Sequence, residues 1–190
     1  MEKKHFEEIA VIFEKTLDTS IPKKLGKKFI IDIFLPFCIK DYQTKVFLHI
    51  NDRVNGFIII TSLQKFYTSL IKSNILLFFF ILVLKIIREP IFIKNIIKIF
   101  RIIKKTREFD YLERYSELLY MAVKDEKQNM NIGYELLNYS INYLKKGNNI
   151  NLLIQTLLNK DGLKARKFYE KNSCSVFSIF EDRIWYIRNL

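Results

Sequence analysis

The chain has 190 residues, 49% of them hydrophobic, and a formal net charge of +12. This length and hydrophobic content exclude a disordered chain and predict one domain with a sizeable core. Cys38 and Cys174 lie far apart in apolar surroundings, which excludes a disulfide framework and suits a reducing cytoplasm. His5 and His49 lack the spacing of metal ligands, so no metal site is predicted.

The positive charge is spread along the chain rather than gathered in one stretch. Scattered lysines are typical of solvated faces, so we expect no nucleic-acid partner. The excess of positive charge would still attract a ligand that carries phosphates.

Two helices are predicted near the N-terminus. Residues 6–18 place their apolar side chains on one helical face, and Pro22 is expected to stop this helix. Residues 24–40 carry a second apolar stripe, within which Pro36 predicts a kink or an early end.

Two strands and a helical segment follow. Residues 45–50 and 54–62 read as strands joined by a turn that contains Asn51 and Asp52. Residues 64–107 read as helical throughout, with a break at the proline at position 90.

This helical segment contains an uninterrupted apolar stretch, residues 75–84, bounded by Lys72 and Lys85. The stretch is well short of the roughly 20 residues that span a bilayer, so a buried helix or strand is predicted. Residues 91–105 place apolar and basic side chains on opposite faces, which predicts a basic amphipathic helix. Its apolar face could pack on its own domain or contact a membrane surface.

The second half of the chain alternates strands and helices. The pattern predicts strands at 117–123 and 151–157, each followed by a helix, at 132–146 and 161–171. A terminal hairpin is predicted from residues 176–180 and 183–188. This order is typical of an α/β (α+β) fold, a mixed sheet with helices on its faces.

The junction between the first strand and the first helix of this half is the most informative stretch. Lys124 to Asn131 form a polar loop, and the helix starts near Ile132. Backbone N–H groups at a helix start have no partner inside the helix and carry partial positive charge. The sequence therefore predicts a site here for a ligand that bears phosphate groups.

The same loop resembles a motif of a known family. Residues 128–133, Gln-Asn-Met-Asn-Ile-Gly, resemble the Q/R-x-x-G-x-G/A loop of the GCN5-related N-acetyltransferase (GNAT) superfamily, which holds the pyrophosphate of acetyl-CoA. Gln128 and Gly133 match this motif, whereas Asn131 stands where the family has its middle glycine. Because asparagine tolerates left-handed backbone better than most residues, we expect the loop to keep its form.

A second motif follows later in the chain. Residues 165–171 resemble the A-x-x-[F/L]-Y-x-K segment of the same family. Ser173 and Cys174 replace the Gly-Phe that usually follows this segment. Gly162 occupies a place where the family often has asparagine, and Asn159 lies three residues before it.

The resemblance extends to the N-terminal half. Residues 25–29 and 55–58 resemble the L-G-x-x-F and G-F-I segments of a subgroup with a longer helical region before the acetyl-CoA motif. The resemblance implies a GNAT-like, mostly antiparallel central sheet, flanked by helices and splayed at its central parallel strands. It also implies a single acetyltransferase-like domain over residues 1–190, with a helical insert at about 64–110. Members of this subgroup are often bacterial and modify sugars or surface glycans.

The family's chemistry implies roles for particular residues. It implies acetyl-CoA as co-substrate, with Glu117 as the candidate base and Tyr169 as the candidate acid for the departing thiolate. The residues alone leave other readings open. Glu117 could face solvent, with Glu113 or Asp110 as the base in its place. Phe168 and Tyr169 could simply form a buried helix face. The implied contacts to acetyl-CoA lie on the strand, the loop and the later helix, at Met121, Ala122, Val123, Gln128, Asn129, Met130, Asn131, Ile132, Gly133, Tyr134, Asn159 and Phe168.

Three functions remain open at this point. The leading one is N-acetylation of a small-molecule amine, with an amino sugar as one candidate acceptor. The second is a catalytically degenerate protein of the same fold that binds a ligand without turnover. The third is a basic membrane-surface protein built around residues 75–105. We expect a monomer or homodimer in the cytoplasm, with peripheral membrane contact as an alternative.

Overall fold

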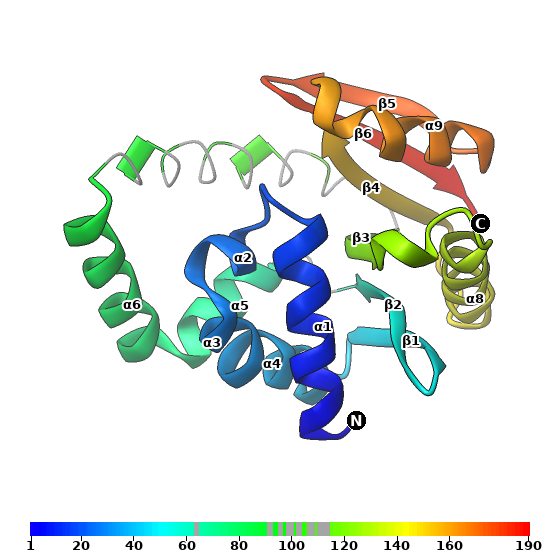
Figure 1. Ribbon diagram of the computed structural model, residues 1–190. Helices are drawn as coiled ribbons and strands as arrows, with labels where there is room; N and C mark the ends of the chain where they lie inside the picture. The colour runs from blue at the N-terminus through cyan, green and yellow to red at the C-terminus, as the bar shows by residue number, and fades with distance from the viewer. Residues whose placement is uncertain are drawn as a thin grey trace.

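The computed structural model describes residues 1–62, 65–90 and 115–190, together with positions 93–94, 97, 101, 104–105 and 109 (Figure 1). The basic amphipathic helix predicted for 91–105 therefore lies largely outside the described residues, as does the last part of the predicted insert.

A six-stranded sheet forms the centre of the fold, in the order β1-β2-β3-β4-β6-β5. Neighbouring strands run antiparallel except β3 and β4, which are parallel, so the predicted mostly antiparallel sheet is confirmed. A crossover helix joins the parallel pair, as such a connection requires. The strands are β1 (Thr44–Asn51), β2 (Arg53–Thr61), β3 (Tyr115–Val123), β4 (Asn151–Leu157), β5 (Ser175–Phe180) and β6 (Arg183–Asn189).

Helices cover both faces of this sheet, and strand β2 shows why. Phe57 and Ile59 contribute to the cluster beneath the N-terminal helices, whereas Ile58 and Ile60 contribute to the cluster on the opposite face. Successive side chains of a strand point to opposite faces, so an unbroken apolar strand must be covered twice. The helices that do this are α1 (Lys3–Thr16), α2 (Ile21–Leu25), α3 (Lys27–Phe29) and α4 (Leu35–Lys40) on one side, and α8 (Ile132–Lys146) and α9 (Leu163–Lys171) on the other.

The N-terminal helices differ from the sequence prediction at both prolines. Helix α1 ends at Thr16, and Pro22 lies in the first turn of α2 instead of stopping α1, a position where its missing N–H is not needed. The disturbance predicted at Pro36 takes the form of a π-helical turn, Ile30–Phe34, in which the Leu35 N–H donates to the Ile30 carbonyl. The wider turn lets the helix continue to α4 without a break.

The apolar stretch at 75–84 is helical but not buried, which contradicts the predicted buried element. It forms most of α6 (Ile75–Arg88), in which no residue is buried. Helix α5 (Phe66–Ser73) precedes α6, and the two meet at a bend of 97°. In the described part of the chain, no helix is by itself long and apolar enough to cross a membrane, although the bent pair reaches that length and composition together.

Candidate functional site

The two parallel strands diverge partway along their length. Backbone pairing of β3 with β4 runs from Tyr115 and Asn151 to Leu118 and Ile154 and then stops. Both strands nevertheless continue, β3 to Val123 and β4 to Leu157. The predicted splay of the central strands is therefore confirmed, and it leaves one edge of β3 without a neighbouring strand among the described residues.

The backbone groups on that free edge can be assigned from one hydrogen bond. The Lys124 N–H donates to the Asn55 carbonyl at 2.9 Å, on the β2 side of β3. Because backbone polar groups alternate in direction along a strand, those of Met121 and Val123 point away from β2 and into the gap. The gap thus presents N–H and C=O groups to an extended ligand.

A bulge in β3 lies next to the point of divergence. Tyr120 pairs with Ile59 while Leu118 pairs with Ile60, so Leu119 is an extra residue in β3. A bulge bends its strand and increases the local twist. This irregularity accompanies the departure of β3 from β4.

The loop between β3 and α8 contains backbone N–H groups that have no protein acceptor among the described residues. Among the residues that the structure describes, no protein acceptor is bonded to the backbone N–H groups of residues 129–134. The first amide of this region with an acceptor is that of Glu135, which donates to the Asn131 carbonyl. The loop therefore presents unpaired donors at a helix N-terminus, as the sequence predicted.

Two asparagines give the loop its shape. Asn129 and Asn131 have φ values of 67° and 64°, so both adopt the left-handed conformation. Asn131 is the N-cap of α8 and stands where the family motif has glycine. Alternation of left- and right-handed residues turns successive N–H groups toward one side, which creates a concavity suited to anions. The asparagine at position 131 thus supplies the backbone geometry for which glycine is commonly used.

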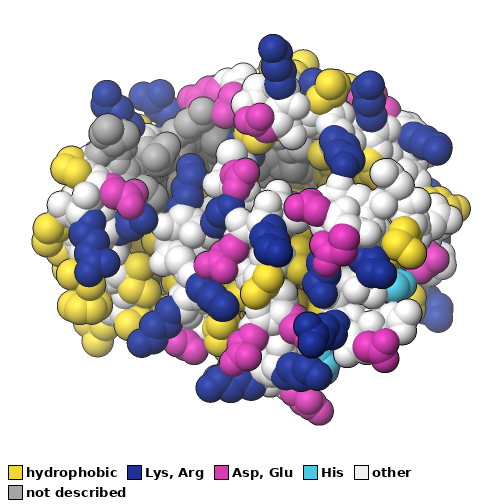
Figure 2. Space-filling model, viewed as in Figure 1, with side chains coloured by type: hydrophobic (Ala, Val, Ile, Leu, Met, Phe, Trp, Pro, Cys, Tyr) yellow, Lys and Arg dark blue, Asp and Glu magenta, His cyan; other side chains and the backbone are white. Residues whose placement is uncertain are grey.

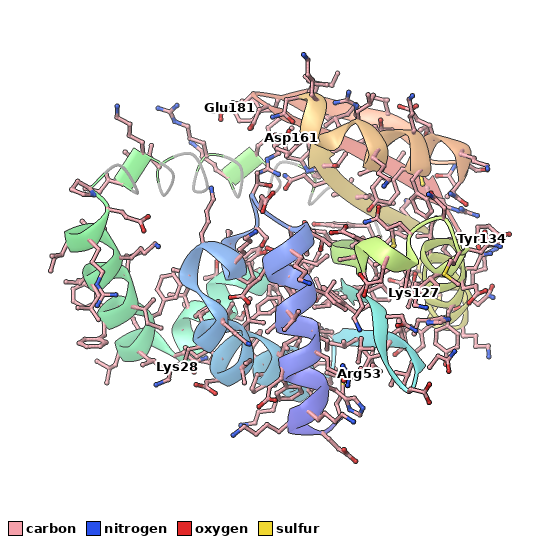
Figure 3. The ribbon with its side chains drawn as sticks, viewed as in Figure 1. Lys28, Arg53, Lys127, Tyr134, Asp161 and Glu181 are labelled. Atoms are coloured by element: carbon pink, nitrogen blue, oxygen red, sulfur yellow. The ribbon has the colours of Figure 1, made fainter. Side chains whose placement is uncertain are left out.

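Side chains fix the loop to the strand and to α9. The Gln128 amide donates to the Asp125 carboxylate at 2.8 Å and to the Val123 carbonyl at 3.4 Å, and it accepts a hydrogen bond from Lys164. Figure 3 shows Lys127 and Tyr134 in this region, where Lys127 is partly buried and Tyr134 is exposed. Cations beside a row of free amides favour a negatively charged ligand.

A cavity of about 540 Å³ opens at the splay. Strand β3 contributes Glu117 and Met121 to its wall, and α9 contributes Tyr169. Glu117 lies one position before the last paired residue of β3, at the closed end of the gap. The two residues with predicted chemical roles therefore line one cavity although they lie on separate elements.

Desolvation raises the pKa of both Glu117 and Tyr169. Desolvation raises the pKa of Glu117 from 4.5 to about 7, because the charged carboxylate loses water. The same effect holds the pKa of the Tyr169 phenol well above its ordinary value, with a smaller contribution from Cys174. At neutral pH, Glu117 is thus poised between its two forms, and Tyr169 stays protonated.

Other predicted ligand residues lie around the loop. Gly133 faces Phe168, and a Cβ at Gly133 would lie 3.5 Å from the phenyl ring, an ordinary contact distance. Ala122 is buried, and Phe168 is partly buried in the cluster that contains α8 and α9. Asn159 is exposed and accepts a hydrogen bond from the Asp161 N–H, which caps a short 3-10 turn. It does not line the cavity, although Asp161 does.

Close packing explains why position 162 is glycine and not the asparagine that the family often has there. A Cβ at this position would lie 1.9 Å from the Leu157 carbonyl oxygen, so no larger residue fits while the turn packs on β4. An asparagine at position 162 would therefore require the end of β4 to move.

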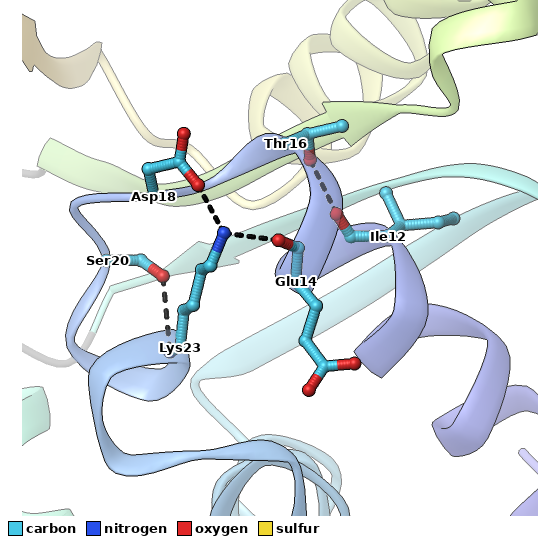
Figure 4. Close-up of polar contacts among 6 residues, drawn as sticks. All are labelled: Ile12, Glu14, Thr16, Asp18, Ser20 and Lys23. Carbon is cyan, nitrogen blue, oxygen red and sulfur yellow. Dashed lines mark hydrogen bonds and ion pairs between the residues drawn. The ribbon is translucent and has the colours of Figure 1, made fainter.

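The connection between α1 and α2 forms a cavity wall that the sequence analysis missed. Residues 16–21 line the cavity. The Lys23 ammonium holds this connection by bonding the Asp18 carboxylate and the Glu14 carbonyl, and the Ser20 hydroxyl caps α2 by accepting from the Lys23 N–H at 3.3 Å (Figure 4). A capping serine before Ile-Pro was the available signal for this helix start.

Two tyrosines and an arginine in the cavity wall were also missed. The hydroxyl groups of Tyr67 and Tyr120 are hydrogen-bonded at 2.5 Å, and burial raises the pKa of both. The buried Nε of Arg183 has no hydrogen-bond partner among the described residues, with the Asp182 carboxylate 3.7 Å away. These residues come from α5, β3 and β6, so no sequence spacing connects them.

Comparison with known structures identifies the fold. The chain is similar to the PaiA N-acetyltransferase from Thermoplasma acidophilum in complex with coenzyme A, with 12% identity and a TM-score of 0.63 over 100% of this chain and 96% of that chain. It is also similar to an aminoglycoside 6'-N-acetyltransferase complexed with coenzyme A, with 12% identity and a TM-score of 0.60 over 96% and 89%. The ribosomal-protein-S18-alanine N-acetyltransferase from Escherichia coli matches with 12% identity and a TM-score of 0.58 over 100% and 90%.

Sequence comparison adds no relative to these structures. No protein-family model matches the chain, and no curated protein matches it. The chain has the fold of the GNAT acetyltransferases.

Proposed function

We propose that the protein is an acetyl-CoA-dependent N-acetyltransferase that acts on the amine of a small molecule. The main support for this proposal is that two features lie next to each other where β3 and β4 diverge. Free amides at the start of α8 offer a diphosphate site, and the cavity beside them holds Glu117 and Tyr169. The resemblance of fold to acetyltransferases in complex with coenzyme A supports the same conclusion.

The co-substrate would be held by backbone groups. The N–H groups of residues 129–134 bind the pyrophosphate, with Gln128 fixing the loop that presents them. The backbone groups of Met121 and Val123 bond the pantetheine amides along the free edge of β3, as an added strand would. Acetyl-CoA supplies the acetyl group as a thioester, and this placement directs that end toward Glu117 and Tyr169.

Glu117 and Tyr169 divide the proton transfers. In its ionised form, Glu117 accepts the proton from the acceptor amine, directly or through water, while the nitrogen bonds the carbonyl carbon. Tyr169 donates its phenolic hydrogen toward the sulfur as the carbon–sulfur bond breaks. A thiol has an ordinary pKa of about 8.5, so a buried phenol of higher pKa acts mainly as a hydrogen-bond donor to the leaving thiolate.

The acceptor would enter on the side formed by α1, α2 and α5. The cavity wall includes Asp18, Lys65 and Tyr67 from this part of the chain, and Arg183 of β6 also lines the cavity. Polar and charged groups of both signs suit a polar amine, and we propose an amino sugar or a derivative of one. Two structures of similar fold are named for an aminoglycoside, which supports this acceptor class.

Calorimetry and a thiol-release assay test the proposal in sequence. We expect acetyl-CoA to bind with favourable free energy, and at least one member of a panel of amino sugars to cause release of free coenzyme A. Binding without release for any amine would favour the ligand-binding alternative. Failure of acetyl-CoA to bind at all would overturn the assignment of the loop as well as the activity.

A further inference from the structure

Helix α6 exposes an apolar surface that the proposed acetyl transfer does not use. Leu76 is 85% exposed and Ile87 is 71% exposed, although both are aliphatic. The surface, here called the α6 face, consists of Ile75, Leu76, Leu77, Phe79, Phe80, Leu84 and Ile87. Figure 2 shows the corresponding group of hydrophobic side chains at the left margin of the molecule, with basic side chains beside it. A contiguous apolar surface of this kind marks an interaction site.

The other side of α6 is anchored to the domain. The ring of Phe78 packs edge-on against Phe29 with centroids 6.3 Å apart, and Ile81 also packs against the N-terminal core cluster. The helix is therefore held with one apolar side inward and a second apolar side outward. Rotation of α6 cannot bury the α6 face without exposing Phe78 and Ile81.

The charges around α6 are strongly biased. Residues 72–90 contain three basic side chains, Lys72, Lys85 and Arg88, and a single carboxylate, Glu89. Glu89 is already paired with Lys85 at 2.7 Å. Lys28 of α3 adds a further cation beside the lower end of α6 (Figure 3). An apolar stripe with basic residues at both ends combines the features that bind anionic lipid surfaces.

We propose that the α6 face docks on an anionic membrane surface. A second copy of the chain is a poor occupant, because a two-fold pair of α6 helices would set the Lys72 end of one against the Arg88 end of the other. Lipid headgroups supply the missing negative charge, and the acyl chains accept Phe79, Phe80 and their neighbours. Lysine and arginine side chains at the helix ends can reach back to the headgroups.

The geometry makes this a surface contact and not a span. Helix α6 has 14 residues, a length of about 21 Å, which is shorter than the roughly 30 Å hydrocarbon core. The bend of 97° between α5 and α6 turns α6 away from the direction of α5. Helix α5 carries Phe66 and Tyr67 in the cavity wall, so docking of α6 brings that wall close to the lipid surface.

Co-sedimentation with vesicles tests this proposal and does not depend on any enzymatic activity. The full chain is mixed with phosphatidylcholine vesicles that contain or lack phosphatidylglycerol, at low and at high salt. We expect sedimentation with the anionic vesicles at low salt and weaker binding to neutral vesicles. The double substitution Leu76→Asp/Phe80→Asp should lower the vesicle partition coefficient at least about tenfold.

A matched control removes the effect of added negative charge. Ile150 and Ile179 are also exposed aliphatic residues, and neither belongs to α6. The variant Ile150→Asp/Ile179→Asp has the same net charge and should retain most of the binding. Circular dichroism and urea denaturation verify that both variants fold.

Three outcomes would overturn the proposal. They are the absence of wild-type binding to anionic vesicles at low salt, equal loss of binding in both variants, and a wild-type dimer that the α6 variant alone dissociates. The last outcome would assign the α6 face to a second copy of the chain.

Discussion

The cavity at the splay and the α6 face depart in opposite directions from the usual distribution of polar and apolar groups. In the cavity, Glu117 is partly buried and Tyr169 is buried, and desolvation raises the pKa of both groups. On α6, large apolar side chains are placed where water is abundant. Buried ionisable groups and exposed apolar surfaces both reduce stability and therefore point to function. The contrast predicts that substitutions restoring the usual distribution preserve the fold and remove a function.

The largest effect is expected from Glu117→Gln. Glutamine keeps the size of the side chain but cannot accept a proton, so kcat should fall by about 10²–10⁴ if Glu117 is the base. Wild-type kcat should rise with pH through about 7, where the carboxylate ionises. Steady-state thiol release over a pH series measures both effects. A wild-type profile that is flat through this range, or a variant with full activity, would assign the base to another group.

Tyr169→Phe should have the next largest effect. Loss of the hydroxyl removes a hydrogen bond to a charged leaving group, worth about 1.5–3 kcal/mol, and kcat should fall about 10- to 100-fold. The dissociation constant for acetyl-CoA should stay nearly the same, as measured by calorimetry. Tyr139→Phe, at an exposed position of α8, is the matched control and should leave kcat unchanged.

Glu117→Gln should also change stability, in the direction opposite to its effect on catalysis. The folded-state pKa of Glu117 is raised above the unfolded value, so the folded state binds this proton more tightly. The wild type therefore loses stability as the pH rises from 4.5 to about 7. At pH 8 the variant should be more stable by about 1–3 kcal/mol, and at pH 4 the two should be equal. Urea denaturation at both pH values measures the difference, and a variant less stable at pH 8 would contradict the burial of the charge.

Gly133→Glu tests the loop separately from the cavity. A carboxylate in the first turn of α8 opposes the pyrophosphate, so the dissociation constant for acetyl-CoA should rise about tenfold or more. The same charge stabilises a helix N-terminus by about 0.3–1 kcal/mol, so unfolding would not explain the loss. Gly133→Ala is the control, because its Cβ would make an ordinary contact with Phe168. Normal binding by Gly133→Glu would show that the diphosphate does not lie at this loop.

The sequence could predict features that depend on local pattern. The strand at β3, the helix start after it, and the left-handed Asn131 follow from residues that are neighbours in the chain. The cavity wall could not be predicted in this way. Tyr67, Arg183 and the connection after α1 converge only when the sheet and its covering helices have formed.

The exposure of α6 was missed for a different reason. Hydrophobic composition reports the preference of a side chain for leaving water, but not whether a surface is available to cover it. Strand β2 is already covered on both faces by α1 and α8 and their neighbours. Only the side of α6 that carries Phe78 and Ile81 therefore reaches the core.

The smallest expected effect is the stability change of Leu76→Ala. Leu76 is 85% exposed on α6, whereas Leu137 is fully buried on α8, so the same truncation has two different consequences. Leu137→Ala should cost about 2–5 kcal/mol in the free energy of unfolding, through lost burial and a cavity. Leu76→Ala should change it by less than about 0.5 kcal/mol. Urea denaturation at dilute protein concentration measures both. If Leu76→Ala were as costly as Leu137→Ala, the α6 face would be covered by protein in solution, and a lipid surface would not be its natural partner.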